Sequence, residues 1–77
     1  PAGYMLLYTN VDKPGMLASV GSVLAEANIN IAGLSLGRIE KGENALTIIN
    51  TDSRIPDSII QLVKSIEGVY EVFQVNI

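Results

Sequence analysis

Residues 10–17 have the sequence Asn10-Val11-Asp12-Lys13-Pro14-Gly15-Met16-Leu17, and this stretch separates two kinds of pattern. Before it, residues 4–9 are aromatic, aliphatic and β-branched, which predicts a strand. After it, apolar residues recur at intervals of three and four, which predicts a helix beginning at about Pro14 and ending at Asn28. The apolar face of this helix is expected to consist of Leu17, Val20, Gly21, Leu24 and Ala27. Gly21 on that face suggests the close approach of a neighbouring backbone.

Working outward, the next two apolar segments predict a pair of strands. Residues 29–38 and residues 45–50 are rich in aliphatic and β-branched side chains. Between them, residues 40–43 contain a glycine among charged residues, which is typical of a hairpin turn.

The remaining third of the chain predicts a second helix and a last strand. The helix should open at Pro56 and end at Gly68. Its apolar stripe is expected to consist of Ile59, Leu62, Val63 and Ile66. Residues 69–77 are the predicted last strand. One face should carry Val69, Phe73, Val75 and Ile77, and the other Tyr70, Val72, Gln74 and Asn76.

The predicted order is therefore β-α-β-β-α-β, which is typical of an α+β, ferredoxin-like sandwich. Such a fold has a four-stranded antiparallel sheet with two helices on one face, and its second and fourth strands lie at the sheet edges. The 77 residues suffice for a single domain, residues 1–77. Because the chain opens with Pro1 rather than Met, we expect it to be the C-terminal piece of a larger enzyme.

The composition argues against most kinds of active site. The chain has no cysteine and no histidine, so disulfides, thiolate or imidazole metal sites and Ser–His or Cys–His catalysis are excluded. We expect no catalytic residue, no metal and no cofactor. Five basic against eight acidic residues disfavour nucleic acid as a partner. The apolar runs are too short to span a membrane, and with no targeting signal we expect a cytoplasmic protein.

Two other classes of ferredoxin-like protein, an RNA binder and an acylphosphatase-like enzyme, can be compared with this sequence. A ferredoxin-like RNA binder stacks bases on aromatic residues of its central strands, and residues 45–50 contain none. An acylphosphatase-like enzyme needs a strong cation at the first loop, where only Lys13 is present. Both functions are disfavoured.

The second predicted strand has an unusual composition for an edge. Exposed edge strands usually carry a charge or a proline that blocks pairing, and residues 29–37 carry neither. The strand either is covered by another element or pairs with the same strand of a second copy. We favour a homodimer, because so short a chain leaves no element to cover the edge. The expected interface residues are Ile29, Ile31, Ala32, Gly33, Leu34 and Leu36.

The loop before the first helix is the best candidate binding site. A helix N-terminus presents unpaired N–H groups that favour carboxylates. Asp12 offers a carboxylate to an ammonium group, and Asn10 and Asn30 offer amides. Such a set would suit a zwitterion such as a free amino acid, although the same residue types also form plain turns. Met16 lies beside this site.

Two motifs resemble those of the ACT domain family. They are Asp12-Lys13-Pro14-Gly15-Met16-Leu17 and Asn28-Ile29-Asn30-Ile31-Ala32. Residues 33–38 and 42–46 extend the resemblance to the ACT domains of D-3-phosphoglycerate dehydrogenase and of bacterial iron–sulfur L-serine dehydratase.

This resemblance implies a regulatory domain that pairs side by side with a second copy into an eight-stranded sheet. In the dehydrogenase, L-serine binds between the two domains and inhibits the enzyme. The implied partners are thus L-serine or another small amino acid, a second copy, and the catalytic domains of the parent enzyme. The implied effector-binding residues are Asn10, Asp12, Gly15, Met16, Leu17, Asn30 and Ile31.

A structural dimerisation unit without an effector is the alternative. The best-known dehydrogenases carry His at the position of Asn10 and Asn at that of Asp12, and this departure favours the alternative.

Overall fold

The computed structural model describes residues 3–38 and 44–76. Its elements follow the predicted order. They are β1 (Tyr4–Val11), α1 (Met16–Glu26), β2 (Ile31–Arg38), β3 (Asn44–Thr51), α2 (Asp57–Lys64) and β4 (Val69–Asn76). The hairpin turn expected at residues 40–43 lies outside the described residues.

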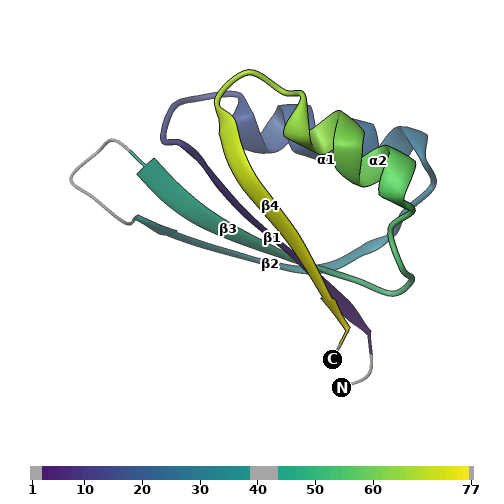
Figure 1. Cartoon of the computed structure of the whole chain (residues 1–77). Helices are drawn as coiled ribbons and strands as arrows, with labels where there is room; N and C mark the ends of the chain where they lie inside the picture. Colours follow the sequence, from purple (N-terminus) through teal and green to yellow (C-terminus); the bar gives the residue numbers. More distant parts are fainter. Residues whose placement is uncertain (1–2, 39–43, 77) are drawn as a thin grey trace.

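The four strands form one antiparallel sheet in the order β2-β3-β1-β4. The predicted ferredoxin-like fold is confirmed, and β2 and β4 lie at the edges as expected. Both helices cover the same face of the sheet and leave the opposite face uncovered (Figure 1). Tyr4 at the start of β1 pairs with Asn76 at the end of β4, so both ends of the chain leave the sheet at the same end. Neither described helix is long and apolar enough to cross a membrane.

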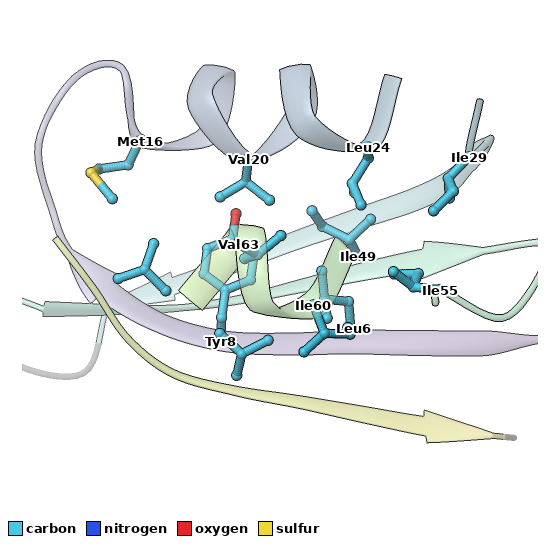
Figure 2. Close-up of a cluster of buried hydrophobic side chains, with 12 residues drawn as sticks. Leu6, Tyr8, Met16, Val20, Leu24, Ile29, Ile49, Ile55, Ile60 and Val63 are labelled. Atoms are coloured by element: carbon cyan, nitrogen blue, oxygen red, sulfur yellow. The ribbon is translucent and has the colours of Figure 1, made fainter. Parts of the chain in front are cut away.

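The core lies between the sheet and the helices (Figure 2). It follows from strand alternation, because every second residue of β1 and β3 points toward the helices. The buried apolar side chains include Leu6, Tyr8, Val20, Leu24, Ile49, Ile55, Ile60 and Val63. This cluster holds the two layers together, since burying each such side chain stabilises the fold by roughly 1.5–3 kcal/mol.

The first helix begins two residues later than predicted. Gly15 is its N-cap, with a left-handed φ of 91° that a helical residue cannot have, so Pro14 lies in the preceding turn and the helix starts at Met16. Met16 therefore points into the core, and Leu17 lies on the exposed flank. The expectation of a close backbone contact at Gly21 was wrong, because a Cβ there would meet no atom within 4 Å.

The helix ends at Glu26, two residues before the predicted end, and Asn28 lies in the turn that closes it. Asn28 has a left-handed φ of 60°. The Asn28 N–H donates to Ala25 O and the Ile29 N–H donates to Leu24 O, both at 3.0 Å. This arrangement is a Schellman motif, in which the residue after the left-handed position packs back on the helix. Ile29 is consequently buried in the core of the single chain, so its side chain offers little surface to the predicted dimer interface.

The second helix ends at Lys64, four residues before Gly68, which lies in the turn that leads to β4. Its buried residues are Ile60 and Val63, so the predicted apolar stripe missed Ile60 and wrongly included the exposed Leu62. The helix is only eight residues long, and its short core-facing stripe leaves Ile66 to pack against the core from the following turn.

Two register shifts change which side chains share a face. The shift between Tyr8 and Asn10 in the β1–β4 pairing puts both Val69 and Val72 on the helix side, so the predicted grouping of Val69 with Phe73 was wrong. The shift between Ile31 and Gly33 in the β2–β3 pairing puts Ile31 on the same face as Leu34. Each shift follows from a bulge, where an extra residue reverses the alternation.

Tyr8 is the largest fully buried side chain, with 1% of its surface exposed. It points from β1 toward the helices (Figure 2). Burial raises the pKa of Tyr8 above its usual value of 10.0, and the neighbouring Thr47 hydroxyl partly opposes this shift. The two hydroxyls are nevertheless not in hydrogen-bonding geometry, and no other described residue bonds the Tyr8 hydroxyl.

We expect Tyr8→Phe to raise the free energy of unfolding by up to about 1 kcal/mol, because it removes a buried polar group that has no partner. Since the folded-state pKa is raised, the wild-type chain should lose stability as the pH rises above 10, and Tyr8→Phe should lose less. Urea unfolding at neutral pH and above pH 10 measures both effects. Tyr70→Phe, at an exposed tyrosine, is the control and should behave as the wild type. A destabilised Tyr8→Phe would show that the hydroxyl has a partner.

Candidate functional site

The loop between β1 and α1 lies at one end of the sheet. Lys13, Pro14 and Gly15 are exposed, and Asp12 is half-buried. The Val11 N–H donates to Gly68 O at 2.8 Å, and the Lys13 N–H donates to Val11 O at 3.1 Å. These bonds fix the loop against the turn that precedes β4.

Asn10 lies at the loop entrance and points into the domain, with 4% of its surface exposed. The Thr47 hydroxyl donates to Asn10 Oδ1 at 3.1 Å, and Asn10 Nδ2 donates to Val11 O at 2.8 Å. The amide thus ties the end of β1 to β3 and to the loop backbone. Thr47 is a partner that the sequence does not reveal, since the two residues are 37 positions apart.

Gly68 lies directly beneath the loop. Its φ is 97°, and a Cβ built there would lie 2.8 Å from Val11 Cγ1 and 3.1 Å from Met16 Sδ. The close approach of Gly68 therefore positions both the end of β1 and the first residue of α1. Met16, expected in the effector site, is buried and contributes to the core below the loop.

We expect Gly68→Ala to lower the free energy of unfolding by about 1–3 kcal/mol, because the added methyl group meets Val11 and Met16 and the backbone favours glycine. Gly37→Ala is the matched control. Its Cβ would meet no atom within 4 Å and its φ is ordinary, so it should change stability by less than about 0.5 kcal/mol. Urea unfolding of both variants decides the matter, and equal stabilities would contradict the role given to Gly68.

The N-terminus of α1 begins at Met16, directly after the loop. Gly15 has no side-chain cap, and the first turn of α1 carries no acidic residue. The Gly15 carbonyl accepts both the N–H and the hydroxyl of Ser19 at 3.0 Å. A Cβ at Gly15 would meet no atom within 4 Å, so the space beside the Gly15 Cα is unobstructed. Such a helix end favours a carboxylate group.

Asn30 lies just before β2 and is exposed. Its Nδ2 donates to Asp52 Oδ2 at 2.7 Å, and the Asp52 N–H approaches Asn30 O at 3.4 Å. The role of Asp52 in holding Asn30 depends on the β2–β3 register, which local sequence patterns do not give.

The two halves of the expected effector site lie at opposite ends of the sheet. Ile31 pairs with Thr51 and thereby lies level with Tyr4, whereas the loop follows Val11 at the far end of β1. Seven strand steps of about 3.3 Å separate these ends by about 23 Å. Asn30 and the loop of one chain therefore do not meet.

The helix side of β2 is apolar and exposed. Leu34 and Leu36 have 50% and 57% of their surfaces exposed, and Ile31 and Leu17 are also exposed. We call Leu17, Ile31, Leu34 and Leu36 the edge patch. Ala32 is exposed at the bulge, and Gly33 lies at a position that belongs to the uncovered face of the sheet. Among residues 3–38 and 44–76, no group of three His, Cys, Asp or Glu side chains is placed to hold a metal ion.

The structure is a small ferredoxin-like α+β domain, and sequence comparison names its family. The sequence model of the ACT domain family matches residues 4–68. The chain belongs to the ACT domain family.

The curated relatives are D-3-phosphoglycerate dehydrogenases, which confirms the resemblance to the ACT domain of that enzyme. The enzyme of Methanocaldococcus jannaschii is 30% identical over 77 residues, which cover 100% of this chain and 15% of the enzyme. The enzyme of Bacillus subtilis is 29% identical over 72 residues, which cover 94% of this chain and 14% of the enzyme. The chain thus spans about one seventh of the length of these relatives.

Solved structures agree on the fold. The C-terminal domain of the MgtC protein from Mycobacterium tuberculosis has a TM-score of 0.74 at 16% identity, covering 97% of this chain and 86% of that one. The ACT domain from GTP pyrophosphokinase of Chlorobium tepidum has a TM-score of 0.70 at 17% identity, covering 94% of this chain and 83% of that one. At these identities the likeness concerns the fold alone.

Proposed function

We propose that this chain is an amino-acid-sensing regulatory domain that binds L-serine between two copies and thereby inhibits a D-3-phosphoglycerate dehydrogenase in the cytoplasm. The observation that carries the proposal is the exposed edge patch along β2, whose outer edge pairs with none of the described strands. Leu34 and Leu36 would be buried by a second copy paired along β2. Because the β1–α1–β2 connection is a right-handed crossover, the Leu17 flank of α1 lies on the β2 side and would contribute to the same contact.

Pairing along β2 also accounts for the separated halves of the site. In an antiparallel pair centred on Ser35, Leu34 of one copy lies opposite the partner's Leu36, and Ala32 lies opposite the partner's Arg38. Asn30 then lies at the same end of the joined sheet as the partner's loop 12–15. One L-serine would place its carboxylate at the N-terminus of α1 and its ammonium group near Asp12 of one copy, within reach of the partner's Asn30.

Inhibition then requires that L-serine prefer one arrangement of the pair over another. Such a preference couples the site to distant catalytic domains with an energy of typically ~1–3 kcal/mol. The relatives favour a dehydrogenase as the parent enzyme over an L-serine dehydratase.

A structural dimerisation unit without an effector is the second candidate. The amide of Asn10 is already bonded to Thr47 and Val11, and the amide of Asn30 is bonded to Asp52. A ligand would therefore have to replace or extend existing hydrogen bonds at these positions.

We expect L-serine to release or absorb heat on titration into the chain, and Asn30→Ala to weaken binding about 10–100-fold, as loss of a hydrogen bond to a charged group would. Isothermal titration calorimetry measures this, with glycine and L-alanine as control ligands. Asn76→Ala, an exposed asparagine at the end of β4, is the matched control and should bind as the wild type. A stable dimer that gives no heat with L-serine would favour the structural unit instead.

We expect Leu34→Lys to abolish L-serine binding while the chain stays folded, because a charge in the edge patch opposes pairing along β2. Circular dichroism checks the fold and calorimetry checks binding. Leu62→Lys places the same charge on an exposed leucine of α2 and should leave binding unchanged. Undiminished binding by Leu34→Lys would mean that the site does not require the β2 pair.

A further inference from the structure

The face of the sheet that the helices leave uncovered is apolar at its centre (Figure 1). Strand register places six side chains on this face, on β1, β3 and β4. They are Met5, Leu7, Leu46, Ile48, Phe73 and Val75. Phe73 is the most exposed of these, with 60% of its surface accessible. None of the six side chains carries a charge or a hydrogen-bonding group, so water forms no hydrogen bonds with them and their burial is favourable.

The side chains on this face are large at one edge of the sheet and small at the other. The β4 edge carries the large side chains of Phe73 and Val75, whereas the β2 edge carries Gly33, Ser35 and Gly37. Residues of β4 and β2 on this face lie at the same positions along the strand direction. Leu7 pairs with Phe73 on one side and with Ile48 on the other, and Ile48 pairs with Ser35. By the same steps through Met5 and Asn50, Val75 is level with Gly33.

We propose that two copies of this chain pack through these faces, related by a two-fold axis that runs along the strands. That rotation leaves the position of each residue along the strands unchanged and exchanges the β2 and β4 edges. Phe73 of one copy therefore lies over the partner's Ser35, and Val75 lies over the partner's Gly33. The large side chains of each copy thus fill the low edge of the other. A two-fold axis across the strands would instead set one β4 edge over the other and leave the glycine edges apart.

The size and charge of the face fit a second copy. Four strands about 4.8 Å apart and eight residues long at about 3.3 Å per residue give a face of roughly 500 Å² per copy. Two copies bury roughly 1,000 Å², the lower limit for a specific interface, so we expect a weak dimer. Self-pairing brings no like charges together at the centre, and Glu71 lies at the bulge beside Thr9, near one corner.

This face dimer is distinct from pairing along β2. The face axis runs between the two packed sheets, over the middle strands of each. The axis of the β2 pair is perpendicular to the sheet and lies outside β2, so the two axes do not meet. Used together, the two contacts build an open row rather than a closed assembly. The face dimer is therefore tested on the Leu34→Lys background, in which the edge patch is blocked.

Sedimentation velocity over a range of concentrations measures the dimer in this background. We expect a reversible dimer that Ser35→Phe weakens at least about tenfold, because the new ring collides with the partner's Phe73. Phe73→Ser should also weaken it, because the low edge is left unfilled. Combining Ser35→Phe with Phe73→Ser exchanges the large and small positions and should restore the dimer. Leu62→Lys on the helix side is the control and should have no effect.

A Leu34→Lys chain that stays monomeric at all concentrations would overturn the proposal. A dimer that ignores Ser35→Phe and Phe73→Ser would do the same, because its contact would lie elsewhere. Weakening by both single changes without restoration in the double variant would overturn the axis along the strands. None of these results depends on L-serine, so they leave the test of the effector site separate.

Discussion

The pairing of β1 on both of its sides is the constraint on which the rest of the structure depends. β1 bonds to β3 along one edge and to β4 along the other, and β3 also bonds to β2, so among the described strands β2 and β4 have an unpaired edge. The same strand supplies Leu6 and Tyr8 to the core and ends at the Asn10 amide, which fixes the entrance of the loop. Core, edge and loop are thus consequences of one central strand.

Much of this arrangement follows from the sequence because alternation and spacing are local signals. The strand 4–9, the helix after Gly15 and the left-handed Asn28 all come from such patterns. The failures arise where one residue changes the phase. A bulge reverses the faces of β4, and the left-handed Gly15 delays α1, which turns Leu17 outward.

The candidate site was predictable only where it depends on local sequence patterns. The loop and the unblocked second strand are visible in the sequence as a polar turn beside a helix start and an apolar run without charge. The partners Thr47 and Asp52 were not, because their pairing with Asn10 and Asn30 is set by the registers between strands distant in sequence. The buried amide of Asn10 makes it a structural support of the loop within the single chain, whatever it contributes to a ligand.

The pairing of Tyr4 with Asn76 has a consequence for how such a domain is joined to others. The two ends of the fold lie on adjacent strands, so a single hinge region at that end of the sheet can carry both connections. A domain of this shape can be placed inside another chain or appended to it without altering its own path. The loop 12–15 lies at the other end, so an attached body need not cover it. Modularity here is a property of chain geometry, independent of any ligand.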